Sequence, residues 1–412
     1  MSHTCRHCRS SLEHTVIDLG HQPPSNAYLR PEQLTLPEIN YPLKLFVCTN
    51  CWLVQLPAHA AADELFTANY AYFSSTSSSW CAHAERFVAT TVDRLGLGPE
   101  SQVVEIASND GYLLQYVQQR GIPCLGIEPT HSTAIAARNR GIETIERFFE
   151  VKLAEELVAD GLSADLVIAN NVLAHVPDIN DFLAGIACLL KPSGLASIEC
   201  PHLLRLLEGN QFDTIYHEHY SYLSLQVVER IAAYVSLVVV DVEELPTHGG
   251  SLRIWLARET SDLEPKAIVQ SVRAAEQAAN LESLEAWVDF QHHAQVAKNK
   301  LLRFLLDEQQ AGRTVIGYGA AAKGNTLLNY AGIRADLLPA VADQAVSKQG
   351  HFLPGSHIPV ISPEELRKQS PQTLLVLPWN LIDEVAQHWP DQCLVAAIPN
   401  LQVRNSANAS TF

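Results

Sequence analysis

The stretch SQVVEIASNDGYLL (residues 101–114) combines a short apolar run, a small polar turn and the start of an amphipathic run. This succession predicts a β-strand, a loop and an α-helix, the first unit of a nucleotide-binding α/β fold. A second apolar run, CLGIEP (residues 124–129), contains Glu128, which lies 23 positions after Glu105. An acidic residue at about this spacing is typical of the carboxylate that holds the ribose hydroxyls of a nucleoside cofactor.

Two more strands are predicted further along the chain. ADLVIA (residues 164–169) runs into two asparagines, and a turn at KPSGL (residues 191–195) precedes ASIECP (residues 196–201). Strands that alternate with helical stretches predict a parallel sheet with its ligand at the carboxyl ends of the strands. Together these segments resemble the class I methyltransferases, which use S-adenosylmethionine. The expected cofactor contacts are Glu105, Ala107, Asn109, Asp110, Gly111, Glu128, Asn170 and Asn171.

Ala107 and Asn109 stand where nucleotide-binding loops commonly carry glycine. A dinucleotide pyrophosphate needs close approach of the backbone at those glycines, whereas adenosylmethionine has no phosphate. The departure favours a methyl donor over NAD. A doubly wound domain with an unrelated ligand stays open.

Length and charge limit the class of protein. With 412 residues and 47% hydrophobic content, the chain is expected to form two or three domains. No apolar run approaches the roughly 20 residues that span a bilayer, and the N-terminus lacks a signal-peptide pattern, so a cytoplasmic protein without a membrane partner is expected. A net charge of −17 argues against a nucleic-acid partner.

Four cysteines form two CxxC pairs, Cys5 with Cys8 and Cys48 with Cys51. Two such pairs supply the four thiolates of a closed tetrahedral zinc site, which leaves no position for water and is therefore structural. The 39 residues between the pairs exceed the usual zinc-ribbon spacing of roughly 15–20, so a small subdomain is expected there. Two unrelated cysteine pairs, or a redox pair, are the alternatives.

Four motifs, read in order, give a more specific resemblance: EIASNDGYLL (residues 105–114), YHEHYSYLS (residues 216–224), THGGSLR (residues 247–253) and GYGAAAKGNTLLNY (residues 317–330). With the paired CxxC motifs, nearly the whole chain resembles the zinc-containing sugar C-methyltransferases, which methylate carbon in nucleotide-linked 4-keto-6-deoxyhexoses. The resemblance implies an α/β protein in three parts: a zinc-binding domain (1–68), a class I methyltransferase, Rossmann-like domain (69–256) and a C-terminal Rossmann-like domain (257–412) that helps hold the nucleotide sugar.

The cluster at residues 216–224 suits carbon methylation, because a C–H next to a ketone must lose its proton to a base while the enolate is held. Histidine is matched to proton abstraction near neutral pH, and tyrosine hydroxyls can donate to the oxyanion. By resemblance, His219 is the general base, aided by Glu218 and Tyr216. Tyr222 is expected to support it, and Tyr70 matches a further active-site tyrosine of the family.

The C-terminal motif predicts a strand (residues 314–319), a glycine turn and a helix (residues 320–328), after a long helical stretch (residues 264–311). Free N–H groups at the helix start suit a diphosphate, with Lys323 as a point charge; an independent NAD site stays open. The expected substrate contacts are His217, His248, Arg253, Gly319, Lys323 and Asn325.

Other interpretations remain at this point. His217 and His219 would share one face of a strand and could bind a catalytic metal, or the cluster could be a structural network. The protein could be an O- or N-methyltransferase on a related sugar, or a nucleotide-binding module without catalysis. C3 is the expected methylation site, but C5, the choice of dTDP or GDP, an amino or hydroxy sugar and the pathway served stay open. A monomer is compatible with the three-part layout.

Overall fold

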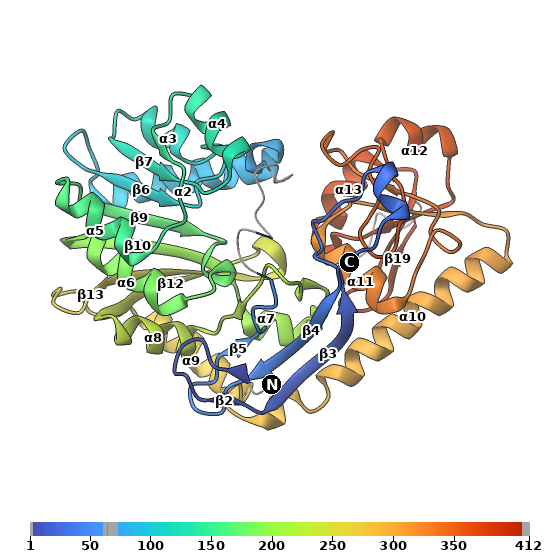
Figure 1. Ribbon diagram of the computed structural model, residues 1–412, viewed down its shortest axis with the longest axis horizontal. Coiled ribbons are helices and arrows are strands. Elements are labelled where there is room, and N and C mark those ends of the chain that lie inside the picture. The colour runs from blue at the N-terminus through green and yellow to red at the C-terminus, as the bar shows by residue number, and fades with distance from the viewer. Residues whose placement is uncertain (1–2, 61–63, 65–72, 406–412) are drawn as a thin grey trace.

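The computed structural model describes residues 3–60, 64 and 73–405, and the chain forms three parts (Figure 1). The central part is built on a seven-stranded sheet in the order β12-β13-β10-β9-β6-β7-β8. Strand β13 runs antiparallel to both of its neighbours, whereas β10, β9, β6, β7 and β8 are mutually parallel. This order, with one reversed strand next to the edge, is that of class I methyltransferases. The bounds are β6 Val103–Ile106, β7 Cys124–Ile127, β8 Thr144–Ile145, β9 Ala164–Asn170, β10 Leu190–Pro201, β12 Leu237–Leu245 and β13 Ser251–Arg258.

Helices cover both faces of this sheet because its strands are apolar on both sides. In β9, Leu166 and Ile168 pack under α2 (Ser78–Leu95), α3 (Leu114–Gln118) and α4 (His131–Asn139). Val167 and Ala169 face the opposite layer. That layer consists of α5 (Val151–Ala159), α6 (Ile179–Leu189), α8 (Leu225–Tyr234) and α9 (Ala267–Ala278).

The N-terminal part contains a short pair, β1 (His3–Thr4) with β2 (Ser11–Leu12), and a four-stranded sheet in the order β11-β5-β4-β3. Strands β3 (His14–Gln22), β4 (Tyr41–Val47) and β5 (Val54–Gln55) come from this part, but β11 is Ser221–Tyr222, which begins two residues after the predicted base His219. A segment that follows β10 of the central sheet thus completes the sheet of the N-terminal part.

The C-terminal part has a six-stranded sheet in the order β16-β15-β14-β17-β18-β19, parallel except for β19. The helical stretch before it consists of α9, the 3₁₀ turn η6 (Leu284–Trp287) and α10 (Phe290–Gln310), which runs along the outside of this part (Figure 1). The remaining bounds are β14 Val315–Tyr318, α11 Ala322–Ala331, β15 Val341–Ala342, β16 Val360–Ile361, α12 Pro363–Gln369, β17 Thr373–Val376, α13 Ile382–His388, β18 Cys393–Ala396 and β19 Gln402–Arg404.

Short elements connect the parts. Helix α7 (Leu203–Glu208) follows β10, and the 3₁₀ turn η4 (Phe212–Thr214) packs against α11. Further 3₁₀ turns are η1 Pro31–Thr35, η2 Ser74–Thr76, η3 Leu173–His175, η5 Thr247–Gly249 and η7 Trp379–Leu381. Among the described helices, none combines the length and apolar character needed to cross a membrane.

Candidate active site

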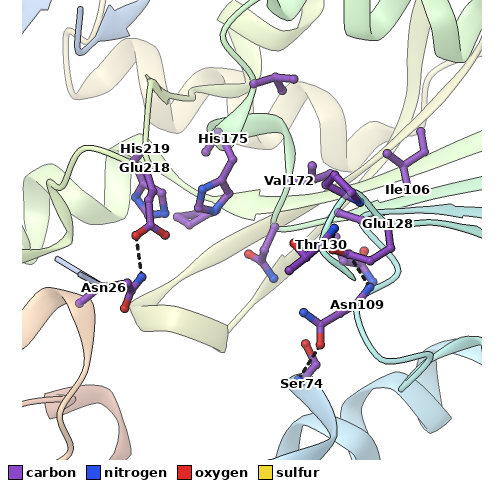
Figure 2. Close-up of a pocket in the computed structure, with 18 of the residues that line it drawn as sticks. Asn26, Ser74, Ile106, Asn109, Glu128, Thr130, Val172, His175, Glu218 and His219 are labelled. Atoms are coloured by element: carbon purple, nitrogen blue, oxygen red, sulfur yellow. Dashed lines mark hydrogen bonds between the residues drawn. The ribbon is translucent and has the colours of Figure 1, made fainter. Parts of the chain in front are cut away.

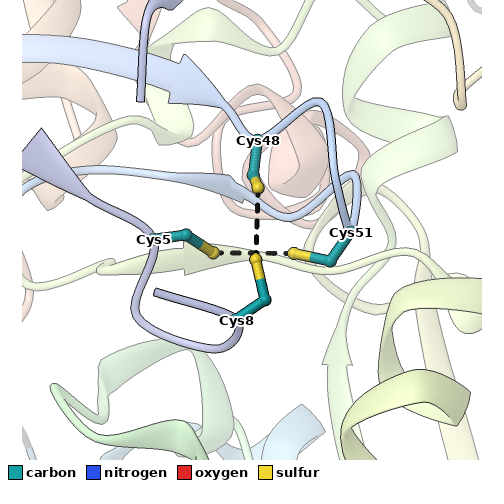
Figure 3. Close-up of side chains that lie close together, drawn as sticks. All are labelled: Cys5, Cys8, Cys48 and Cys51. Atoms are coloured by element: carbon teal, nitrogen blue, oxygen red, sulfur yellow. Dashed lines mark hydrogen bonds between the residues drawn. The ribbon is translucent and has the colours of Figure 1, made fainter. Parts of the chain in front are cut away.

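The four cysteine side chains converge between the loop after β1 and the loop between β4 and β5 (Figure 3). All four Sγ atoms lie within 4.8 Å of one another, and Cys5, Cys48 and Cys51 are buried. Across the described part of the chain, no other cluster of three or more His, Cys, Asp or Glu side chains has metal-binding geometry. Four convergent thiols fit a closed, structural zinc site.

The loop after β6 has the backbone conformation that glycine usually adopts, although two of its positions, Ala107 and Asn109, are not glycine. Ala107 and Asn109 have φ angles of 55° and 50°, and Gly111 has 75°. A non-glycine residue in the left-handed region costs free energy and is retained where the surroundings require it. Glu128, at the end of β7, fixes the loop, because its Oε2 accepts the Asn109 N–H at 2.9 Å and its Oε1 accepts the Thr130 N–H at 2.9 Å.

One cavity of about 390 Å³ connects this loop with the histidine motif and the C-terminal part. Figure 2 shows Glu218 and His219 on one side of it, His175 in the middle, and Glu128 with Asn109 on the other side. The predicted residues that line it are Ala107, Asn109, Glu128, Asn170, Asn171, Tyr216, Glu218, His219, His248 and Lys323.

The donor end of the cavity fits a nucleoside with an amino-acid tail. The buried side-chain amide atoms of Asn171, and Oδ1 of Asn170, have no hydrogen-bond partner within the described residues, and both side chains line the cavity. Unsatisfied buried polar atoms of this kind indicate a ligand that supplies donors and acceptors. With the Glu128 carboxylate, they fit the polar groups of adenosylmethionine.

Three predicted cofactor residues lie behind the cavity wall. Glu105 is buried in β6, and burial together with the nearby Glu128 raises the pKa of its carboxyl well above the usual value. Asp110 accepts from the Ser75 hydroxyl and pairs with Arg140 at 3.2 Å. Gly111 has φ 75° and a Cβ on it would lie 3.1 Å from the Ile142 side chain, so a side chain at this position would be strained.

The histidine motif folds as a turn, because the His219 N–H donates to the Tyr216 carbonyl at 2.9 Å. The turn brings the Tyr216 hydroxyl to 2.8 Å from His219 Nε2. On the other side of the ring, His219 Nδ1 lies 3.0 Å from the Thr214 carbonyl oxygen. Since a carbonyl oxygen only accepts, Nδ1 carries the proton and Nε2 keeps a lone pair that accepts from Tyr216.

The neighbourhood keeps His219 neutral. Burial, and then the adjacent His175, hold the pKa of His219 well below its usual value. The His175 ring lies 4.6 Å from the His219 ring, and burial lowers its own pKa to about 4. His248 also lines the cavity, with a pKa lowered to about 4 by burial. His175 was missed by the sequence reasoning, although it stands five residues after Asn170, between β9 and α6.

Asn26 of the zinc domain reaches the same turn. Its side-chain amide donates to Glu218 Oε1 at 2.7 Å, and both residues line the cavity. His217 faces away, with its ring 5.8 Å from that of Tyr41, so the expectation that it shares a strand face with His219 is wrong: the segment is a turn. The Tyr222 side chain is buried in the core that α7 shares with the N-terminal sheet. Tyr70 lies outside the described residues.

The C-terminal end of the cavity is formed by the start of α11 and two lysines, Lys323 and Lys348. Lys323 Nζ donates to Asn380 Oδ1 at 2.8 Å. Lys348 Nζ donates to the Ala320 carbonyl at 2.8 Å and lies 3.4 Å from Asp343. Lys348 was not anticipated from the sequence, because it follows β15 in a loop without a recognisable pattern.

Besides His217, three further predicted substrate residues do not line this cavity. Arg253 is buried in β13, with Glu199 at 2.8 Å and Glu243 at 3.2 Å as ion-pair partners. Asn325 donates to the Ser25 carbonyl at 2.6 Å and ties α11 to the zinc domain. Gly319 has φ 85°, and a Cβ there would lie 2.5 Å from Pro378.

The acid after β15 fixes the loop that follows β14. Asp343 Oδ2 accepts the Ala320 N–H at 2.7 Å and Oδ1 accepts the Ala345 N–H at 2.8 Å. Asp343 does not line the cavity, and Lys348 lies 3.4 Å from it.

Three family models match consecutive parts of the chain. A model described as "Putative zinc binding domain" matches residues 5–66, "Methyltransferase domain" matches residues 80–242, and "C-methyltransferase C-terminal domain" matches residues 246–393. The C-methyltransferase NovU of Streptomyces niveus is 34% identical over 381 residues, which cover 92% of this chain and 90% of that protein.

Solved structures resemble somewhat less than half of the chain. The magnesium protoporphyrin IX methyltransferase ChlM from Synechocystis PCC 6803, with bound SAM, is 15% identical over 44% of this chain and 81% of its own, with a TM-score of 0.33. The PH0226 protein from Pyrococcus horikoshii OT3 is 15% identical over 45% of this chain and 94% of its own, with a TM-score of 0.38.

The strand order of the central sheet and the matched methyltransferase domain define a class I methyltransferase. Its methyl donor is S-adenosylmethionine, and its four-cysteine cluster is a structural zinc site. The matched flanking domains and the similarity to NovU identify it further: the chain belongs to the zinc-containing C-methyltransferases. The fold class, the family and both cofactors predicted from the sequence are thereby confirmed.

Proposed function

We propose that this C-methyltransferase acts on a nucleotide-linked 4-keto-6-deoxyhexose and methylates C3, next to the C4 ketone. One observation carries the proposal: a single cavity joins the donor loop at Asn109 and Glu128, the neutral His219, and Lys323 of the C-terminal part. A substrate with a keto sugar at one end and a diphosphate at the other would place its reactive carbon between the methyl donor and the base.

His219 is the proposed general base. Its Nε2 lone pair takes the C3 proton, and the electron pair of the broken C–H bond passes into an enolate on the C4 oxygen. The Nδ1–H bond to the Thr214 carbonyl fixes the tautomer that makes Nε2 the basic atom. Asn109 and Glu128 would help to hold adenosylmethionine at one end of the cavity; when bound it would supply an electrophilic methyl group, which would form a bond to the enolate carbon as the S–CH3 bond breaks and adenosylhomocysteine leaves.

Tyr216 is the proposed donor to the enolate oxygen. Its hydroxyl rests on His219 Nε2 at 2.8 Å and must leave that nitrogen before the base can act. The hydroxyl, beside the base, can then donate its proton in a hydrogen bond to a developing oxyanion. Glu218, held by Asn26, places a carboxylate in the same cavity, which favours the imidazolium that forms.

Proton exchange tests the proposal before methyl transfer is required. The protein would be incubated with a dTDP- or GDP-linked 4-keto-6-deoxyhexose in deuterated water, with and without adenosylmethionine, and the sugar followed by NMR and mass spectrometry. Deuterium at C3, and a carbon-bound methyl group when the donor is present, are expected. Methylation of oxygen or nitrogen without exchange would refute the enolate, and methylation at C5 would correct the position.

A further inference from the structure

Trp379 lies where three segments of the active site meet. Its indole Nε1–H donates to Asp213 Oδ2 at 2.8 Å, and Lys323 Nζ lies 4.8 Å from the centre of its ring. A Cβ on Gly249 would stand 2.4 Å from its Cη2 atom. Asp213 belongs to η4 just before the His219 turn, Lys323 to the start of α11, and Gly249 to the loop that carries His248.

The indole has little freedom in this position. Gly249 leaves room for the ring only because it has no side chain, and the Gln211 side chain donates to the Gly249 carbonyl at 2.8 Å. The Asp213 acceptor holds the opposite part of the ring system. Trp379 is therefore a fixed platform beneath the Lys323 ammonium, and cation–π attraction favours that placement.

The hydrogen bond from the Trp379 indole does not require a charged acceptor, because a neutral side-chain amide could accept it equally well, yet Asp213 is a carboxylate. Its side chain is inaccessible to solvent, and Oδ1 has no hydrogen-bond partner within the described residues. Burial raises the pKa of Asp213 to about 6, and the charge of Lys323 opposes that rise. A buried carboxylate with an unused oxygen destabilises a fold, so a compensating role for the charge is expected.

Lys323 is the group that gains from this charge. In the described structure, no carboxylate lies within ion-pair distance of it, and burial lowers its pKa while Asp213 counteracts the effect. Lys348 differs, because its ammonium already has Asp343 and the Ala320 carbonyl as partners. Lys323 thus keeps a positive charge toward the cavity without a close anion.

We propose that Asp213 and Trp379 are positioning residues that hold Lys323 charged and directed into the cavity, where it binds the diphosphate of the substrate. This inference rests on the proposed function. The Asp213 carboxylate lies on the other side of the indole and favours the charged form of Lys323 without forming an ion pair with it. Asn380 accepts a hydrogen bond from the Lys323 ammonium and so fixes the direction of that side chain. The nearest anion to the Lys323 ammonium would then be the diphosphate of the bound substrate.

Two conservative variants separate the contribution of the Asp213 charge from that of the Trp379 hydrogen bond. Asp213→Asn keeps an acceptor for the indole and removes the charge, whereas Trp379→Phe keeps an aromatic ring and removes the Nε1–H. Trp389→Phe is a matched control: Arg367 lies over that ring at 4.9 Å, and Trp389 does not line the cavity. Lys323→Gln shows how much binding affinity is lost when the ammonium group itself is removed.

Binding of dTDP, GDP and adenosylmethionine would be measured by calorimetry, followed by kcat and KM with the keto sugar. Both variants should raise the Kd of the nucleoside diphosphate, and the KM, about tenfold, with the adenosylmethionine Kd and kcat within about twofold. The Trp389→Phe control should match the wild type.

The outcomes distinguish this inference from the proposed function. If Lys323→Gln weakens nucleoside diphosphate binding but Asp213→Asn and Trp379→Phe do not, the positioning role is refuted and the proposed substrate class stands. A fall in kcat at unchanged KM, or an equal effect of Trp389→Phe, also overturns it. Failure of the wild-type protein to bind either nucleoside diphosphate would refute both proposals.

Discussion

Replacing His219 gives the sharpest test of the proposed chemistry, because its two ring nitrogens have separate partners. His219→Asn can still donate to the Thr214 carbonyl, in place of Nδ1, but has no basic nitrogen. His219→Gln places its amide closer to the Nε2 position and also lacks a base. Loss of a positioned general base slows proton transfer by about 10²–10⁴-fold, or roughly 3–5 kcal/mol of activation free energy.

Deuterium uptake at C3 without adenosylmethionine measures that step directly. Both variants should lose exchange by this factor and keep the affinity for adenosylmethionine, because Asn109 and Glu128 lie in the loops after β6 and β7 rather than in the His219 turn. His131→Gln, an exposed histidine on α4, is the control for a histidine-to-amide change. Wild-type exchange rates in either His219 variant would refute the base assignment.

The pH dependence follows from the direction of the pKa shift. The pKa of His219 is held well below 6.5, so its neutral, basic form persists as the pH falls below that value. The exchange rate should stay level from pH 8 to about 5.5, whereas a histidine of ordinary pKa would lose about tenfold by pH 5.5. An acidic limb with a midpoint near 6.5 would contradict the buried, neutral imidazole.

Three further predictions concern the cofactors and stability. Asn171→Ala should raise the Kd of adenosylmethionine about tenfold in calorimetry, because its unsatisfied amide faces the donor end; an unchanged Kd would exclude that contact. Zinc chelation, or Cys48→Ser, should lower the melting temperature. Either change should also reduce the rate of C3 exchange by a larger factor than the affinity for adenosylmethionine. Equal losses of exchange rate and affinity would contradict a local effect on the base. Burial lowers the pKa values of His217 and His248 to about 4 in the folded protein, below the unfolded value of about 6.5. The free energy of unfolding should therefore fall as the pH drops from 6.5 toward 4, by up to about 3 kcal/mol for each residue. A urea midpoint that is the same at pH 7.5 and pH 5.5 would refute this.

The sequence sufficed for the features that depend on local pattern. Residues 101–114 predicted the donor unit because strand, turn and helix each leave a periodic signal, and the CxxC pairs predicted the zinc site because ligand type and spacing are specific. The structure also gave a reason for the missing glycines: Ala107 and Asn109 adopt the left-handed backbone themselves.

Contacts between distant segments could not be predicted in this way. Arg253 stands in a glycine-rich motif that suggests a phosphate contact, but Glu199 of the neighbouring strand β10 neutralises it. Lys348 carries no local signal, and the cavity that it lines is formed by residues far apart in the sequence, from Asn26 to Lys348 itself. His217 and His219 alternate in sequence, but the turn at residues 217–218 sends them to different environments.

The same long-range packing explains why a methyltransferase would keep a structural zinc. Gln55 donates to Cys5 Sγ at 3.2 Å and lies in β5, four residues after Cys51. Strand β5 pairs with Ser221–Tyr222, and the Leu56 N–H donates to the Tyr220 carbonyl at 3.0 Å, so the chain immediately after His219 is hydrogen-bonded to the zinc domain. The Thr214 carbonyl holds the imidazole from the other side. A closed metal site takes no part in proton transfer, but here it supports the strand that follows the turn with His219, the proposed base.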